Sequence, residues 1–371
     1  MVTLALGYLP KIRKAANGSS FFGSEQIQKR IRKGDSDMAV QVDIFNPQET
    51  VIAKGLAGKS ALIYGSNSLG KTAQAVRMPK PFVIATESGL NATVGVKYNR
   101  VTSWADFTKI VKQFTSKQTV DKAREMYDTI IIDELYALAL LCQDYVQSVI
   151  GEGALTMADS TDPRKNLYAA YEKLFFKAIN TLLSCDYTVI FIGHEQIDGK
   201  TGKASPKGDK RSVDPVRDFV DYVVYLKSNG TDEKGNVIPS SAYLAETDKW
   251  FARSRFETTP TYLPVWTAEA FEEAVDAGIE GLEKEKGVKA VSYQEQKEKN
   301  TTKEYDYEQT MAQIQEVGQK LVEADKIDVL TEIVEDTLGK GKKVSECTKK
   351  QIEAMVIILD NLKDKVAELK L

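Results

Sequence analysis

The amino-acid sequence predicts an α/β fold with a mostly parallel central sheet, followed by a small helical domain at the C-terminal end. Short, continuous apolar runs rich in β-forming residues recur along the chain, and helical stretches separate them. Strands buried on both faces of a parallel sheet have this character, and their alternation with helices is typical of βαβ units. In addition, a glycine-rich loop follows the first run directly. The predicted strands are Ser60–Tyr64, Phe82–Thr86, Thr129–Ile132, Thr188–Ile192 and Tyr222–Leu226.

Helices and a terminal hairpin complete the predicted core. Apolar residues recur at helical spacing over Leu135–Val149 and Leu167–Leu183. After the last parallel strand, two more strand-like segments, Ala242–Glu246 and Lys249–Phe256, are separated only by Thr247-Asp248. Two such segments around a short polar turn predict a β-hairpin at the end of the core.

Changes in composition divide the chain into four parts. Residues 1–50 are predicted as a basic arm, with seven Lys or Arg against one Glu up to residue 34, which could bind DNA or a neighbouring subunit. Residues 51–282 form the predicted core, and the charged residues 283–306 read as a linker. Residues 307–371 are acidic and helical by period, and they predict a three-helix bundle. Alternatives for this bundle are a cap on an oligomer or a docking module for a single-strand binding or replication protein.

Overall composition excludes several classes of protein. The net charge of −3 shows no general excess of basic groups, so any nucleic-acid binding must come from local patches. No apolar run approaches the roughly 18 residues of a membrane span, and we expect no membrane partner. Three widely spaced cysteines indicate free thiols and a cytoplasmic location. His194 is the sole histidine, which argues against a zinc site.

A complete phosphate-binding motif, G-x-x-x-x-G-K-[ST], follows the first predicted strand. Its glycines let the backbone turn so that N–H groups point at a phosphate, while Lys71 adds charge at the β- and γ-phosphates and Thr72 ligates Mg²⁺. The sequence therefore predicts ATP and Mg²⁺ as cofactors. The motif consists of Gly65, Ser66, Asn67, Ser68, Leu69, Gly70, Lys71 and Thr72.

A second metal ligand is predicted at the end of another strand. Asp133 closes the run TIIID, and the carboxyl ends of parallel strands are where such sheets bind ligands. We interpret Asp133 as a Mg²⁺ ligand beside Thr72. The alternative is that Asp133 caps the helix that begins near Leu135.

Two carboxylates compete for the role of the residue that activates water. Glu134 follows Asp133 directly, and Glu87 follows the strand Phe82–Thr86. Either could reach a γ-phosphate from a strand end, and either could instead be a helix N-terminal acid. The spacing alone does not choose between them.

The order of these motifs resembles the RecA-type core, and more specifically the phage family of RecA-like single-strand annealing ATPases, the P-loop Sak group. The resemblance covers roughly residues 50–265 and is carried by the phosphate loop and by the segments FVIATE and VIFIGHE. It implies that Glu87 is the catalytic acid and that His194 is a γ-phosphate sensor. Gln196 keeps an amide alternative open for that sensor.

The resemblance also implies two loops that contact single-stranded DNA. The first match is Gly151–Asn166, which carries Arg164 and Lys165. The second is Asp198–Arg211, whose Gly and Pro residues predict neither helix nor strand. Neither loop has an aromatic residue for base stacking, so we expect salt-sensitive contacts to the phosphate backbone. The basic residues of the second loop are Lys200, Lys203, Lys207, Lys210 and Arg211.

Arg253 and Arg255 lie in the predicted terminal hairpin. The family carries a basic pair near this place, and RecA-like assemblies insert such cations into a neighbour's ATP site. One of the two is therefore a candidate for a residue that acts in trans across an oligomer interface. The alternative is an edge-strand charge that prevents aggregation.

Together these features predict an ATPase that binds and anneals single-stranded DNA in phage recombination, working as a homo-oligomer in the form of a ring or filament. A packaging or helicase-loading motor with Glu134 as the base is one alternative. A nucleotide-gated scaffold without enzymatic activity is the other.

Overall fold

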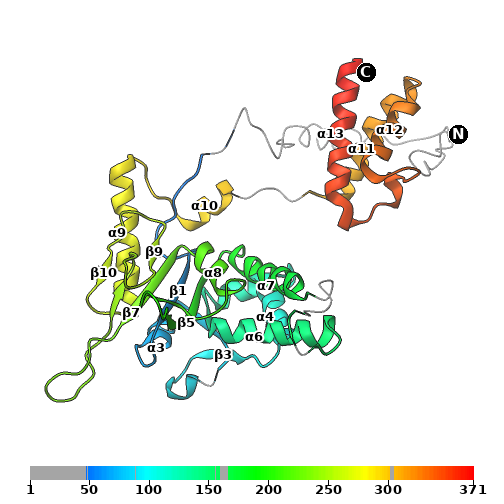
Figure 1. The fold of residues 1–371 in the computed structure, drawn as a ribbon. Coiled ribbons are helices and arrows are strands. Elements are labelled where there is room, and N and C mark those ends of the chain that lie inside the picture. Colours follow the sequence, from blue (N-terminus) through cyan, green and yellow to red (C-terminus); the bar gives the residue numbers. More distant parts are fainter. Residues whose placement is uncertain (1–46, 48, 88, 155, 159–165, 301–304) are drawn as a thin grey trace. The chain divides into compact units, whose positions relative to one another are not determined.

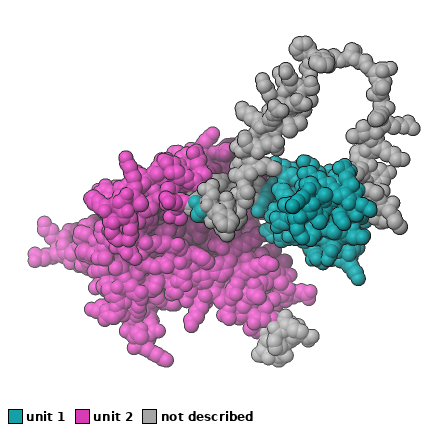
Figure 2. Space-filling view, turned by 90° about the horizontal axis from the view of Figure 1, so that it is seen from above, with its two compact units in different colours: residues 1–48, 301–371 teal, residues 49–300 magenta. Residues whose placement is uncertain are grey.

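The computed structural model describes residues 47, 49–87, 89–154, 156–158, 166–300 and 305–371. The chain divides into two compact units, residues 49–300 and a second unit that contains the C-terminal helices (Figure 2). The predicted basic arm and the residues Arg164 and Lys165 lie outside the described residues, apart from a few positions next to residue 50.

Residues 49–300 are built around a ten-stranded sheet in the part of the chain that the structure describes (Figure 1). The strand order is β10-β8-β7-β1-β5-β4-β2-β3, while β6 pairs with β5 and β9 with β7. The five predicted strands correspond to β1, β2, β4, β5 and β7, all parallel to one another. The bounds are β1 Ser60–Gly65, β2 Pro81–Ala85, β3 Lys97–Arg100, β4 Thr129–Asp133, β5 Thr188–Ile197, β6 Ala204–Pro206, β7 Tyr222–Lys227, β8 Ser241–Tyr243, β9 Arg253–Ser254 and β10 Tyr262–Leu263.

Helices cover both faces of this sheet, because successive strand residues point to opposite sides. Leu62 and Tyr64 belong to one buried cluster with α4, α6 and α7, whereas Ala61 and Ile63 belong to another with α3 and α9. The predicted α/β core with a mostly parallel sheet is therefore confirmed. The helices of this unit are α3 Lys71–Ala75, α4 Trp104–Thr115, α5 Val120–Met126, α6 Leu135–Tyr145, α7 Tyr168–Leu183, α8 Val213–Phe219, α9 Ala268–Lys286 and α10 Tyr293–Asn300, with short turns at Gly89–Ala92 and Val146–Ile150.

The sheet ends in antiparallel strands, but the pairing differs from the predicted hairpin. Strand β8 pairs with β7 and β10, and β9 pairs with the start of β7, so the two predicted segments do not pair with each other. The reason is a competing partner. The backbone around Trp250 bonds to β6, with Ala204 N donating to Lys249 O and Phe251 N donating to Ala204 O.

The prediction of a linker over residues 283–306 is wrong for residues 283–300. Helix α9 continues to Lys286, and α10 packs against the core. Asp186 accepts a hydrogen bond from the Tyr293 hydroxyl at 2.6 Å and forms an ion pair with Lys297 at 2.7 Å. Most charged residues of this segment are exposed, so its polar composition reflects helices that face solvent rather than a lack of structure.

The C-terminal unit consists of α11 (Tyr307–Glu323), α12 (Ile327–Leu338) and α13 (Ile352–Leu369), with two short turns at Val344–Glu346 and Lys349–Gln351. Asp306 begins α11 by accepting a hydrogen bond from Gln309 N at 2.7 Å. The three helices enclose their own apolar cluster, formed by residues such as Ile314, Leu330, Met355, Ile358 and Leu362. None of the helices described in either unit has the length and apolar character to cross a membrane.

Candidate nucleotide site

The phosphate loop connects β1 to α3, and its two glycines are required by its path. Gly65 has φ +154°, and a Cβ there would lie 2.6 Å from the carbonyl oxygen of Leu226. Gly70 has φ +80° immediately before α3. L-residues rarely adopt such conformations, so the loop depends on glycine at both positions.

Lys71 is buried at the start of α3, and its amine lies against the loop. The Lys71 Nζ donates to the carbonyl oxygens of Ser66 at 2.6 Å and Gly65 at 3.0 Å. Burial lowers the pKa of this amine, although nearby carboxylates act in the opposite direction. An ammonium placed here carries its charge inside the concave loop, as phosphate binding requires.

Thr72 and Asp133 come together although 61 positions separate them. The Thr72 hydroxyl donates to Asp133 Oδ2 at 2.9 Å, and burial raises the pKa of the Asp133 carboxyl. A hydroxyl and a carboxylate supply hard oxygen ligands, which suit Mg²⁺. The alternative role of Asp133 as a helix cap is wrong, since Glu134 caps α6 by accepting from Ala137 N at 2.9 Å.

Glu87, Glu134 and His194 form one cluster at the carboxyl edge of the sheet. One ligand atom from each residue lies within 4.8 Å of the others, and Glu87 Oε2 is 3.8 Å from His194 Nε2. Register places them there, because His194 in β5 is paired with Gly65 in β1. Both predicted candidates for the catalytic acid therefore lie beside the phosphate loop.

The two glutamates differ in their surroundings. Glu87 is about half exposed and lines a cavity of about 450 Å³ next to the loop. Glu134 is 3% exposed, and its Oε1 has no hydrogen-bond partner in the described structure. Burial raises the pKa of the Glu134 carboxyl. The cavity is lined by Ser66, Asn67, Glu87, His194, Glu195 and Lys207.

Comparison with known proteins places this site in a family. A family model described as "AAA domain" matches residues 57–256, more than half of the chain and including every residue of the site. The chain belongs to the AAA domain family. It is also 48% identical, over 332 residues, to the SPbeta prophage-derived uncharacterized protein YorG of Bacillus subtilis (strain 168). That match covers 88% of this chain and 99% of the relative.

Membership of the AAA domain family, with a prophage-derived relative, supports a P-loop ATPase of phage origin. It agrees with the motif Gly65–Thr72, which lies inside the matched residues. The finer resemblance to the Sak group is not part of what these matches show.

The segment predicted as an irregular DNA-binding loop, Asp198–Arg211, is in part a β-hairpin. Strand β6 (Ala204–Pro206) pairs antiparallel with Glu195–Ile197 at the end of β5. Asp198 Oδ1 closes the turn by accepting from the backbone N–H groups of Lys200 and Thr201. The glycines therefore occupy the turn and the segment after β6, and the expectation of no strand is wrong.

The basic residues of this hairpin have different surroundings. Lys203 pairs with Glu246, while Arg211 pairs with Glu172 at 2.9 Å and lies over the Tyr168 ring. Lys207 lines the cavity beside the phosphate loop, a placement that the sequence did not indicate. The side chains of Lys200 and Lys210 are exposed.

Glu195 is a cavity residue that the sequence analysis missed. It directly follows His194 and accepts a hydrogen bond from the Tyr225 hydroxyl at 3.1 Å. The available signal was its place one position beyond the predicted sensor, at the end of a buried strand.

Arg253 and Arg255 lie at the other edge of the sheet, beside the start of β7. Arg253 donates to the carbonyl oxygens of Asp218 and Val220, at 2.8 and 2.6 Å. Arg255 donates to Phe219 O at 2.5 Å and lies 3.7 Å from Asp221. Both guanidinium groups thus cap the C-terminus of α8, and neither joins the nucleotide site of its own chain.

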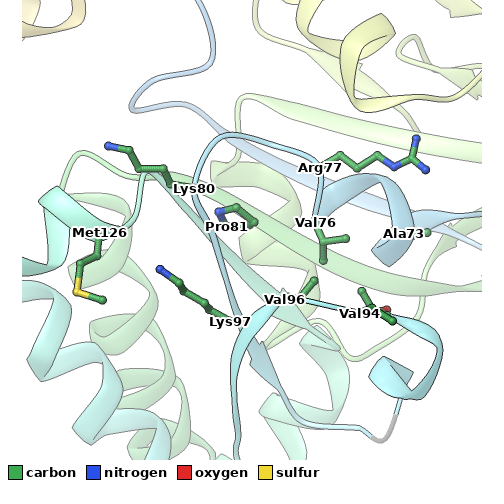
Figure 3. Close-up of a pocket in the computed structure, with 11 residues that line it drawn as sticks. Ala73, Val76, Arg77, Lys80, Pro81, Val94, Val96, Lys97 and Met126 are labelled. Carbon is green, nitrogen blue, oxygen red and sulfur yellow. The ribbon is translucent and has the colours of Figure 1, made fainter.

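A larger cavity of about 550 Å³ is lined by residues of α3, of the segment between α3 and β2, and of the segment before β3 (Figure 3). Its cationic residues are Arg77, Lys80 and Lys97, and Figure 3 shows Arg77 extending away from the two lysines. Lys80 is paired with Asp128 at 3.5 Å. The three cations do not converge, and no predicted site residue lines this cavity.

Proposed function

We propose that this protein is an ATPase that binds and anneals single-stranded DNA in phage recombination, within the Sak-type group of RecA-like proteins. One observation carries the proposal: the basic β5–β6 hairpin continues directly from the nucleotide site. His194 and Lys207 face the same cavity, and Lys207 N donates to His194 O at 2.8 Å. A change at His194 therefore has a direct backbone route to a hairpin that carries exposed lysines.

In this proposal each site residue has a distinct task. Lys71 binds the β- and γ-phosphates, and Thr72 and Asp133 would hold Mg²⁺, which neutralises phosphate charge when bound. Glu87 orients the attacking water and accepts its proton, because it is the more exposed of the two glutamates and faces the cavity. His194 contacts the γ-phosphate and positions the hairpin.

We further propose that the protein assembles and docks a partner. A homo-oligomer, as a ring or filament, would place many DNA-binding hairpins along one strand. The C-terminal helical unit is a candidate docking site for a single-strand binding or replication protein. Arg253 or Arg255 could enter a neighbour's ATP site only if bonds to the end of α8 were released.

The test is ATP hydrolysis measured with and without an oligothymidylate. We expect the oligonucleotide to stimulate the wild-type rate, and Glu87→Gln to lower that rate about 10²- to 10⁴-fold while ATP still binds. The exposed Glu233→Gln serves as the control and should match the wild type.

Two outcomes would contradict the proposal. A hydrolysis rate that is insensitive to the oligonucleotide would remove the link between DNA and the nucleotide site. A loss confined to Glu134→Gln would favour the motor alternative, in which the buried, unpartnered Glu134 Oε1 activates water.

A further inference from the structure

Four aromatic rings form a continuous strip across the antiparallel end of the sheet. Tyr225, Tyr243 and Tyr262 are direct cross-strand neighbours on β7, β8 and β10. Ring centroids are 6.4 Å apart for Tyr225 and Tyr243, and 5.0 Å for Tyr243 and Tyr262. Trp250 lies against two of them, 4.4 Å from Tyr243 and 5.5 Å from Tyr225. We call these four residues the aromatic strip.

The strip occupies a face of the sheet from which the covering helices are displaced. Ala242, Leu244 and Leu263 alternate with the strip tyrosines and are buried in the cluster that contains α9. On the opposite face, α4, α6 and α7 lie toward the other end of the sheet from β10 (Figure 1). Tyr262 is accordingly 46% exposed, and the other three rings are partly exposed.

Hydrogen bonds at the polar edges hold the rings in place. Trp250 Nε1 donates to Ala245 O at 3.2 Å, and the Tyr262 hydroxyl lies 3.2 Å from Ser241 Oγ. The Tyr225 hydroxyl donates to Glu195 at 3.1 Å. Because these rings are already held in place, little side-chain conformational entropy is lost when a ligand stacks on them.

The strip is also connected to the phosphate loop and to the basic hairpin. Tyr225 contacts the buried Tyr64, 5.2 Å between centroids, and Tyr64 immediately precedes Gly65. The backbone of Lys249 and Phe251, on either side of Trp250, bonds to Ala204 in β6. Lys227 Nζ lies 5.8 Å from the Trp250 ring centroid, and Lys249 is exposed beside it.

We propose that the aromatic strip stacks the bases of single-stranded DNA whose phosphates contact the β5–β6 hairpin and Lys227. This inference rests on the proposed DNA-binding function and supplies the stacking surface that the basic segments lack. Exposed rings beside cations suit a single strand, because its bases are free to stack and its backbone is anionic. In a duplex the base faces are already stacked and unavailable.

The binding experiment compares a fluorescein-labelled oligothymidylate with an abasic oligonucleotide of the same length and charge. We expect the full-length wild-type protein to bind the oligothymidylate more tightly, and Tyr262→Ala to weaken that binding about 5- to 150-fold, the effect of about 1–3 kcal/mol of stacking. Tyr262→Phe, which keeps the ring, should bind like the wild type. The control Tyr98→Ala changes a 54% exposed tyrosine on β3, at the opposite edge of the sheet.

A second measurement needs no variant. Trp104 and Trp266 are buried, so quenching of tryptophan fluorescence by a stacked base should come from Trp250. Oligothymidylate should quench the wild-type emission, and the abasic strand should not.

The outcomes separate this inference from the proposed function. If the wild type binds neither strand, DNA binding itself is wrong and the inference fails with it. If it binds both strands equally, or if Tyr262→Ala binds like the wild type, DNA binding stands and base stacking on the strip is overturned. The inference is also overturned if Tyr262→Ala weakens only ATP binding or only self-association, since the strip would then serve the nucleotide or another copy of the chain.

Discussion

At the scale of single residues, the Thr72–Asp133 pair gives a test of the predicted metal ligands. Thr72→Val keeps the shape of the side chain but removes the hydroxyl that donates to Asp133. We expect the affinity for ATP in the presence of Mg²⁺ to fall about tenfold or more, because a hydrogen bond to a charged group contributes about 1.5–3 kcal/mol. Titration calorimetry with and without Mg²⁺ measures this. Thr72→Ser, which keeps the hydroxyl, is the control, and an unchanged affinity in Thr72→Val would remove Thr72 from the metal site.

Gly65 and Gly193 are a matched pair for testing the backbone of the phosphate loop. They lie on adjacent paired strands, but a Cβ at Gly65 would approach Leu226 O to 2.6 Å, whereas the nearest atoms at Gly193 are 3.6 Å away. We expect Gly65→Ala to lower the free energy of unfolding by about 2–3 kcal/mol and Gly193→Ala to change it little. Urea unfolding of both variants measures the difference, and equal stabilities would show that the loop can relax around a methyl group.

At the scale of secondary structure elements, the arginines at the end of α8 have two competing interpretations. As caps, they satisfy carbonyl groups that the helix leaves without partners. We therefore expect Arg255→Ala to lower the free energy of unfolding by about 1 kcal/mol while the hydrolysis rate per folded molecule stays unchanged. If Arg255→Ala instead proves inactive, we would mix it with inactive Glu87→Gln, because restored activity would require Arg255 to act across an oligomer interface.

One anchor of helix α10 is the carboxylate of Asp186, which also pairs with Arg124 at 2.8 Å. Partial burial alone would raise the pKa of Asp186, but hydrogen bonds from Lys297 and Tyr293 outweigh it and lower that pKa. A lowered pKa means that the folded state gains stability above the ordinary value near 3.9 and loses it as pH falls through the folded value. We expect Asp186→Asn to cost about 1 kcal/mol at pH 7, since solvent screens a partly exposed pair, and less at pH 3. Urea unfolding at both pH values tests this, and a pH-independent difference would contradict it.

The hairpin formed by β5 and β6 shows why some elements escaped the sequence analysis. Glycine and proline between Asp198 and Arg211 favoured an irregular loop, yet Gly199 and Gly202 occupy the turn and Pro206 ends β6. Strand β3 was missed for a related reason: its four residues are all exposed at the sheet edge, so they carry no apolar pattern.

At the scale of the whole molecule, the sequence predicted those features that depend on residues close together in the chain. The phosphate loop and the buried parallel strands have patterns of neighbouring residues, and the structure contains them. The sequence placed Glu87 and Glu134 at strand ends as candidate acids, but their proximity to His194 depends on strand order, which no local pattern records. Only the family resemblance pointed to His194 as a sensor. The aromatic strip depends on cross-strand register in the same way, because its rings are dispersed between Tyr225 and Tyr262.

The two compact units lead to a prediction about unfolding. The C-terminal helices bury residues such as Ile358 and Leu362 in a cluster of their own, separate from the two clusters that flank the sheet. A unit with its own core unfolds as its own cooperative step. We expect scanning calorimetry of the full chain to show two transitions, one of which responds to ATP and Mg²⁺.

At a ligand concentration about 100 times the dissociation constant, the responding unit should gain about 2.7 kcal/mol. The responding transition belongs to residues 49–300, which contain Lys71 and Thr72. If Thr72→Val weakens ATP binding tenfold, the gain at the same ligand concentration should fall to about 1.4 kcal/mol. A single transition that moves as a whole with ATP would instead mean that the helical unit and the ATPase core unfold together, so that nucleotide binding stabilises both.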